Sequence, residues 1–244
     1  LLGITLLEDA SRLWVYVRYV HAEAPRRQRV LRLSEDGNAE VIVDDLPVSP
    51  APAVHNGGGL RFGPDGYLYM TVGVAKYDRP GGIANQGGDE ESLLAQDPTS
   101  PHGTILRMRP DGSNMDIYAY GFRNPFALTF APDGTLYVAD VGPTSPEVDE
   151  INRIVRGGNY GWPLHTGRRG DDRFIDPIWS FEHIVTPAGL AFAGDELYVC
   201  EFSFRRLRRF GVTKEGLVDQ GVVAEGCIAN VVRGLDGAIY FTSL

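Results

Sequence analysis

The chain has 244 residues and a formal net charge of −9, and this acidic balance disfavours nucleic acid, whose phosphates need a cationic surface. No apolar run approaches the roughly 20 residues needed to span a bilayer. The 30 glycines and 16 prolines are typical of many short strands joined by tight turns, so the composition favours an all-β protein.

A hairpin unit recurs along the chain. Each copy reads as a strand, a tight turn that commonly contains Asp-Gly, and a second strand rich in aromatic and β-branched residues. In chain order the copies lie at 8–16, 61–70, 130–138, 192–199 and 233–241, the first being degenerate. A second hairpin type alternates with the first, at 30–37, 105–112 and 207–216. Two alternating hairpins make a four-stranded antiparallel sheet, which is the blade of a β-propeller.

The repeats predict one β-propeller domain over residues 1–244, with about five blade units visible. We expect the six-bladed type with an N-terminal blade that is incomplete or absent, because residues 1–4 resemble the interior of a strand. One long stretch, 78–103, is rich in glycine and acidic residues and lacks strand periodicity. Long loops on a rigid scaffold are usually functional or disordered, so this loop is a candidate part of a site.

Cys200 and Cys227 are the two cysteines, and they fall in predicted strands of neighbouring repeats. A disulfide between them is geometrically conceivable, and two separate buried thiols fit the sequence equally well. Both interpretations remain open at this point.

Five further stretches follow one another in a fixed order. They are 55–66 (HNGGGLRFGPDG), 95–100 followed by 103–107, 120–125 (YGFRNP), 142–143 with 149–152, and 157–163 (GGNYGWP). In this order they resemble the motifs of the glucose/sorbosone dehydrogenase family, β-propellers whose members oxidise sugars with pyrroloquinoline quinone (PQQ). The resemblance covers nearly the whole chain.

The resemblance implies a catalytic pair. His55 would be the base that removes the hydroxyl proton of a sugar, a task that suits a neutral imidazole. Arg123 would stabilise the negative charge that grows on the quinone oxygens, because its guanidinium is always charged and donates in a plane. Asn124 would contact the cofactor beside it.

The resemblance also implies calcium. Gly142 and Pro143 would contribute to cofactor binding and offer main-chain carbonyls to a Ca²⁺ ion bound with PQQ, since calcium prefers oxygen ligands. A second, structural Ca²⁺ in some family members implies a role for Glu150 and Tyr160, with Asp149 adjacent. A solvated strand end is the alternative interpretation of Asp149 and Glu150.

One departure from the family lies beside the predicted base. Val74 stands where family members carry the carboxylate that supports the catalytic histidine. Without that partner the imidazole ring loses the group that orients it. Asp78 or Asp89, in the following loop, are the candidate substitutes.

The other departures remove positive charge from one side of the expected cofactor pocket. Ser203 stands at a cationic position of the family, with Arg205 or Arg206 as candidate substitutes. A family run that helps neutralise PQQ aligns with 227–230, where Cys227 and Ala229 carry no charge. Anion binding without these cations would be weaker.

The sequence therefore predicts a quinoprotein-type sugar dehydrogenase that oxidises an aldose or sorbosone-like hydroxyl or aldehyde with PQQ and calcium. Its expected partners are a small sugar and an external electron acceptor, and its expected location is the periplasm or the exterior of the cell. The alternative is a catalytically degenerate propeller that binds carbohydrate or protein. A metal-dependent lactonase is disfavoured, since no suitable cluster of carboxylates and asparagines is evident.

Overall fold

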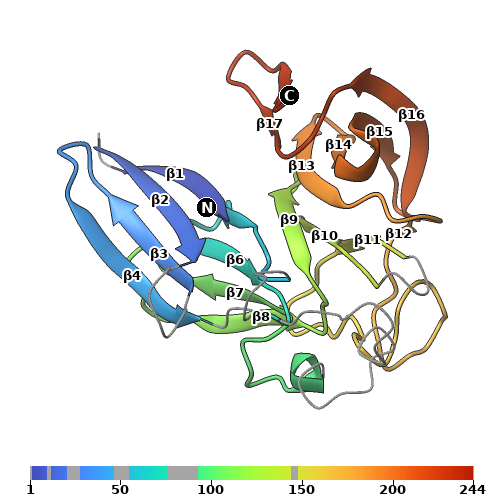
Figure 1. The fold of residues 1–244 in the computed structure, drawn as a ribbon, viewed down its shortest axis with the longest axis horizontal. Helices are drawn as coiled ribbons and strands as arrows, with labels where there is room; N and C mark the ends of the chain where they lie inside the picture. The colour runs from blue at the N-terminus through green and yellow to red at the C-terminus, as the bar shows by residue number, and fades with distance from the viewer. Residues whose placement is uncertain are drawn as a thin grey trace.

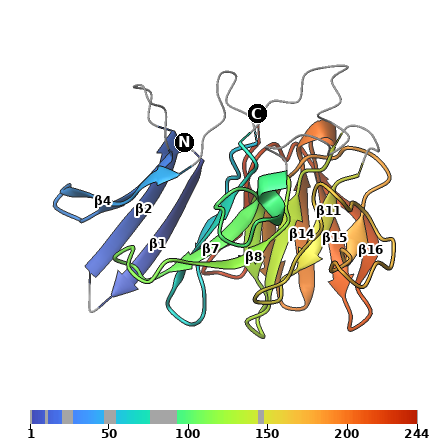
Figure 2. The same ribbon diagram turned by 90° about the horizontal axis from the view of Figure 1, so that it is seen from below.

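The structure is a computed structural model that describes residues 2–9, 12–20, 28–46, 55–75, 93–143 and 148–243. It is built from antiparallel sheets whose strands are ordered consecutively, so each strand pairs with its neighbour in the chain. Figure 1 shows these sheets arranged around a common axis. Seen from the side, their strands run between two faces of the molecule (Figure 2).

Within the described residues, four sheets have four strands each and the last has two. Sheet 1 consists of β1 (Gly3–Asp9), β2 (Arg12–Val20), β3 (Gln28–Leu33) and β4 (Ala39–Leu46). Sheet 2 consists of β5 (Leu60–Phe62), β6 (Leu68–Val72), β7 (Thr104–Met108) and β8 (Asp116–Tyr120). Sheet 3 consists of β9 (Pro125–Phe130), β10 (Leu136–Asp140), β11 (Glu150–Arg153) and β12 (Trp179–Ser180).

Sheet 4 consists of β13 (Pro187–Ala193), β14 (Glu196–Glu201), β15 (Arg206–Val212) and β16 (Leu217–Glu225). Sheet 5 is the hairpin of β17 (Val231–Arg233) and β18 (Ile239–Phe241). The single-turn 3-10 helices Leu94–Gln96 and Phe202–Phe204 lie in connections. No helix in the described part of the chain is long and apolar enough to cross a membrane.

The first strands of the five sheets surround the axis. β1, β5, β9, β13 and β17 each lie against the next. The first four of these strands, with Ala229 and Asn230 just before β17, line a central cavity of about 300 Å³. Four-stranded sheets that present their first strands to a central channel define a β-propeller, as the repeats predict.

Each pair of neighbouring sheets encloses its own apolar core. Leu68 and Met70 of β6 pack on sheet 1, whereas Tyr69 between them packs on sheet 3. Successive side chains of a strand point to opposite faces, and both faces of this sheet are covered. Both sets of alternating side chains in this sheet are therefore buried. Side chains packed between neighbouring sheets hold the sheets together.

The recurring Asp-Gly pairs have a structural role. In the turns after β5, β9 and β17 the aspartate side chain accepts the main-chain N–H two residues later, at Asp65, Asp133 and Asp236. The following glycine has a φ near +80°, as at Gly134 (86°), a conformation that favours glycine.

The sequence predicted an incomplete or absent N-terminal blade and a long loop at 78–103. Sheet 1, at the N-terminus, has four strands, and the sheet with fewer strands among the described residues is sheet 5. A ring of six blades and a single domain over 1–244 remain predictions. Of the expected loop at 78–103, residues 78–92 lie outside the described residues, and 93–103 contain the short helix Leu94–Gln96 and turns.

The two cysteines form a disulfide, which resolves the alternative that the sequence left open. Cys200 is the last residue but one of β14 and Cys227 precedes β17, with Cα atoms 5.6 Å apart. Both are fully buried and pack with Leu207 and Val231 in the core between sheets 4 and 5. The bond therefore ties the short hairpin of sheet 5 to the complete sheet beside it.

Removal of this bond is expected to weaken the fold. The double variant Cys200→Ala/Cys227→Ala should lose about 2–4 kcal/mol of unfolding free energy, because the unfolded chain regains the freedom of the closed loop. Urea denaturation followed by circular dichroism measures the loss. Wild-type protein kept in reductant should match the variant, and an unchanged midpoint in both samples would contradict this role.

Candidate functional site

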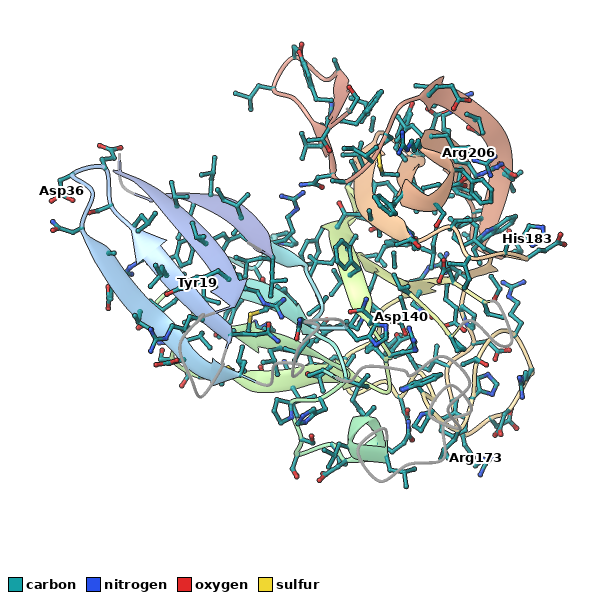
Figure 3. The ribbon with its side chains drawn as sticks, viewed as in Figure 1. Tyr19, Asp36, Asp140, Arg173, His183 and Arg206 are labelled. Atoms are coloured by element: carbon teal, nitrogen blue, oxygen red, sulfur yellow. A yellow bond between two sulfur atoms is a disulfide. The ribbon has the colours of Figure 1, made fainter. Side chains whose placement is uncertain are left out.

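The predicted site residues gather at one face of the molecule, where the first strands begin. Residues 55–59 precede β5 and 123–124 precede β9. Asp140, the last residue of β10, pairs with Pro125, the first residue of β9, so the segment 141–143 leaves the sheet at the same end. We call this end of the strands the site face. Asp140 is labelled in Figure 3.

A buried carboxylate organises this face. Asp140 Oδ2 accepts the main-chain N–H of Arg123 at 2.9 Å, and its Oδ1 accepts that of Asn124 at 2.6 Å. The Asn124 side chain extends the connection, since its Oδ1 accepts the N–H of Gly57 at 2.9 Å. Val74 N–H donates to the Arg123 carbonyl at 2.9 Å. Segments from three parts of the chain are therefore held together around Asp140.

The Arg123 side chain lies across the next predicted segment. Its Nη1 donates to the carbonyls of Val141 at 3.1 Å and Gly142 at 2.8 Å. The guanidinium lies 5.6 Å from the centre of the Trp162 ring, and the residue is only 4% exposed. The structure thus brings Arg123 and Asn124 next to Gly142-Pro143, as the resemblance implies.

Two glycines make these close approaches possible. A Cβ atom on Gly142 would lie 1.6 Å from the carbonyl oxygen of Val148, and one on Gly73 would lie 2.1 Å from that of His55. No side chain fits at such distances, so glycine is required at both positions. The Gly142 contact holds the end of β10 beside the start of β11.

His55 begins the segment that leads into β5. It is half-buried, and its φ of 52° lies in the left-handed region. Its carbonyl accepts the N–H of Ala75 at 2.8 Å, which holds it against the end of β6. A non-glycine residue in this region stores backbone strain of a kind common at functional sites.

The position of the missing carboxylate is apolar. Val74 is 3% exposed and clusters with Ala95 and Trp162. The family's supporting acid is therefore replaced by a hydrophobic contact between the end of β6, the short helix and the loop after β11. The candidate substitutes Asp78 and Asp89 lie outside the described residues.

Arg18 is a functional candidate that sequence reasoning missed. It projects from β2 of sheet 1, is fully buried, and donates to the carbonyls of Asn56 at 2.7 Å and of Thr71. Its Nε donates to Gln28 Oε1 at 3.0 Å. Burial lowers the pKa of Arg18 to about 9. The guanidinium thus supports the His55 segment from sheet 1. In the sequence, the one sign of this role was an arginine at an inward-facing position of a predicted strand.

Asp149 performs a second bridging role. Its Oδ1 accepts the Gly142 N–H at 2.9 Å, and its Oδ2 accepts those of Val185 at 2.8 Å and Thr186 at 2.7 Å. Burial raises the pKa of this carboxyl. Asp149 is fully buried, so it is not a solvated strand end, and it ties Gly142 to the start of sheet 4.

Glu150 is also buried, but Tyr160 does not meet it through its side chain. The Glu150 carboxylate accepts the Gly167 N–H at 2.5 Å. The Tyr160 hydroxyl donates to the Arg153 carbonyl at 2.8 Å and accepts the Val155 N–H at 2.9 Å, beyond the far end of β11. Only main-chain atoms of Tyr160 are left for the predicted calcium site. No group of three or more His, Cys, Asp or Glu side chains suited to a metal occurs among the described residues.

On the opposite side of the site face, the positions where the family has cations are uncharged. Ser203 shares a hydrogen bond of 3.0 Å with Thr186, and Cys227 is held in the disulfide. Ala229 lines the central cavity. Of the candidate substitutes, Arg206 pairs with the fully buried Glu201, so its charge is already balanced. Arg205, the other substitute, is exposed.

Fold and site define a β-propeller with an arginine, an asparagine and a Gly-Pro pair assembled beside a strained histidine. The sequence model of the family described as "Glucose / Sorbosone dehydrogenase" matches residues 1–243, so the chain belongs to this family. The predicted fold and family are both confirmed.

Individual relatives agree with this assignment. The chain is 32% identical to quinoprotein glucose dehydrogenase B of Acinetobacter calcoaceticus over 171 residues, which cover 62% of the chain but only 35% of that relative. A putative oxidoreductase (glucose dehydrogenase) of Thermus thermophilus superposes with a TM-score of 0.81 at 32% identity, over 94% of this chain and 73% of that one. The PQQ-bound aldose sugar dehydrogenase of Streptomyces coelicolor superposes with a TM-score of 0.71 at 26% identity, over 91% and 66%.

Loss of the Arg18 brace should destabilise the protein. Arg18→Met leaves the carbonyls of Asn56 and Thr71 buried without their donor, so we expect a loss of about 2–4 kcal/mol in urea unfolding. The control is Arg29→Met, which removes an ion pair with Asp44 from the rim of the same sheet. The control should leave the midpoint nearly unchanged. Equal effects of the two changes would contradict the bracing role.

The buried acids should make stability depend on pH. Burial raises the pKa of Glu150 to about 8 and that of Asp140 to about 7, both above the ordinary range. The folded state therefore binds protons more tightly than the unfolded chain, and stability should fall as pH rises from about 5 to 8.5. In calcium-free buffer with EGTA, thermal unfolding should show a smaller fall for Glu150→Gln than for wild type. An identical fall in stability in both proteins would show that Glu150 does not contribute to the pH dependence.

Proposed function

We propose that this chain carries the active site of a quinoprotein sugar dehydrogenase that oxidises an aldose with PQQ. The observation that carries the proposal is the Asp140 cluster, which assembles Arg123, Asn124 and Gly142 beside the His55 segment in a member of the glucose/sorbosone dehydrogenase family. The names of the relatives, which include a quinoprotein and a PQQ-bound enzyme, support the same cofactor.

The residues on the side of sheets 2 and 3 fit an anionic, planar cofactor. Arg123 offers a guanidinium that is held in place by two carbonyls, and its charge and planar donors suit quinone and carboxylate oxygens. Asn124 is fixed by its bonds to Asp140 and Gly57, so it would present a set orientation to a ligand. These two residues would hold PQQ.

Calcium is a further part of the proposal. The Gly142 carbonyl already accepts one hydrogen bond from Arg123, and a carbonyl oxygen has two lone pairs. The Gly142 and Pro143 carbonyls would help to hold a Ca²⁺ ion, since calcium prefers oxygen ligands. Asp149 fixes the main chain of Gly142 and would keep this carbonyl in place.

In the proposed reaction His55 accepts the proton of a sugar hydroxyl. PQQ, when bound, supplies the acceptor for the two electrons and the hydrogen that leave the carbon. Arg123 stabilises the negative charge that develops on the acceptor side, in a site where low exposure strengthens the interaction. Val74 stands where the family carries a supporting carboxylate, and the left-handed backbone of His55 sets the direction in which its side chain leaves the chain.

The proposed location is outside the cytoplasm, in the periplasm or the medium. The buried Cys200–Cys227 disulfide supports it, because such bonds persist mainly in oxidising compartments. An external electron acceptor would then reoxidise the cofactor.

A second candidate function is a carbohydrate- or protein-binding propeller without catalysis. It is favoured by Ser203, Cys227 and Ala229, which leave the side of sheets 4 and 5 without the cations that the family uses. The residues on the side of sheets 2 and 3 therefore support the enzyme, and those on the side of sheets 4 and 5 support the binding protein. A test of PQQ binding distinguishes the two functions.

Titration of PQQ with Ca²⁺ into the purified protein tests the proposal. We expect saturable binding, a rise in melting temperature through ligand linkage, and dye reduction with at least one aldose of a panel. His55→Ala should retain PQQ binding and lose turnover by about 100-fold or more. Arg123→Met should weaken PQQ binding by about tenfold or more, because a charge-assisted contact is lost.

The control is His183→Ala, since His183 is an exposed histidine on the outer side of the ring (Figure 3). This variant should match wild type in binding and turnover. A well-folded protein that binds no PQQ would reject the enzyme and favour the binding function.

A further inference from the structure

A second cavity opens at the face opposite the site face, where the first strands end. It has a volume of about 270 Å³ and is lined by residues of four sheets, among them Arg61 of β5, Phe130 of β9, Phe192 of β13 and Arg233 of β17. Arg61 also lines the central cavity, so the two spaces meet at this side chain. The two arginines come from sheets 2 and 5, which are not neighbours in the ring.

Arg61 is a guanidinium without a balancing charge. Its side chain is largely enclosed, and burial alone lowers its pKa, with no contribution from a carboxylate. In the part of the chain that the structure describes, no hydrogen bond or ion pair reaches this side chain. Arginine is rarely enclosed without a partner, because removing the charge from water costs free energy. An enclosed arginine without a protein partner is therefore expected to contact a ligand or ordered water.

The surroundings favour an anion. Arg233 stands at the same cavity, is exposed, and has no ion pair among the described residues. None of the described residues that line this cavity is acidic, although the chain as a whole carries a charge of −9. The walls between the arginines include Phe130 and Phe192, and apolar walls strengthen the field of nearby charges.

We propose that Arg61 and Arg233 bind a small tetrahedral oxyanion, a phosphate or sulfate group, at this end of the central channel. Paired guanidinium groups suit such an anion, because each offers parallel N–H donors as well as charge. The cavity has room for about nine water molecules at about 30 Å³ each, which is ample for the anion and its remaining hydration. Thr129, which also lines the cavity, adds a hydroxyl donor.

This anion site is separate from the candidate sugar site. Arg61 lies on β5, whereas His55 and Asn56 precede the opposite end of that strand. The inference does not rest on the proposed dehydrogenase function, and either one can fail without the other.

Isothermal titration with inorganic phosphate at constant ionic strength tests the proposal. We expect one saturable site in wild type, a drop in affinity of at least about tenfold in Arg61→Gln and a smaller drop in Arg233→Gln. The control is Arg169→Gln, which removes an exposed arginine that does not line this cavity. It should bind phosphate as wild type does.

A second measurement, of melting temperature, tests whether Arg61→Gln still folds. Without phosphate, Arg61→Gln should melt no lower than wild type, because an enclosed charge without a partner has been removed. With phosphate, wild type should gain melting temperature and Arg61→Gln should not. PQQ titration of the same variant should match wild type if the two sites are separate.

Three results would overturn the proposal. One is the absence of saturable binding of both phosphate and sulfate. Another is equal phosphate affinity in wild type and Arg61→Gln. The third is binding of succinate in preference to phosphate and sulfate, since a linear dicarboxylate would then be the better match for the two arginines.

Discussion

The site face depends on one buried carboxylate. Asp140 is 5% exposed and accepts the main-chain N–H groups of both Arg123 and Asn124. Because Asn124 in turn accepts the N–H of Gly57, a residue at the end of β10 sets the position of the segment that carries His55. Two neighbouring N–H groups that share one buried carboxylate form a satisfied polar network, and such networks are rigid.

Around this carboxylate the residues proposed to bind PQQ all lie on one side. Sheets 2 and 3 supply the arginine, the asparagine and the Gly-Pro pair. Arg18 reaches across from sheet 1 and supports the segment after His55 through the Asn56 carbonyl. On the side of sheets 4 and 5, a disulfide and a serine hydrogen bond stand where the family has cations. A cofactor bound here would be held mainly from one side, which we expect to lower its affinity without changing the chemistry at His55.

The fold could be predicted because its determinants are local. Asp-Gly turns and period-2 strands recur within each repeat, and they formed the expected hairpins. The proximity of Arg123 and Gly142 followed from the order of the family motifs. The roles of Asp140 and Arg18 could not be predicted, since each acts through buried contacts with residues distant in the sequence. The direction of the Tyr160 hydroxyl was also hidden, because it depends on how the loop after β11 folds back.

Hydrogen exchange of Asp140→Asn tests the central claim most directly. The amide keeps one acceptor oxygen but places an NH₂ group against a main-chain N–H, so one of the two bonds must break. We predict faster exchange, by about tenfold or more, at the amides of 123–124 and also at Gly57, with sheet 1 unchanged. Faster exchange confined to 123–124, with Gly57 as protected as in wild type, would contradict the claim that Asp140 organises the whole face.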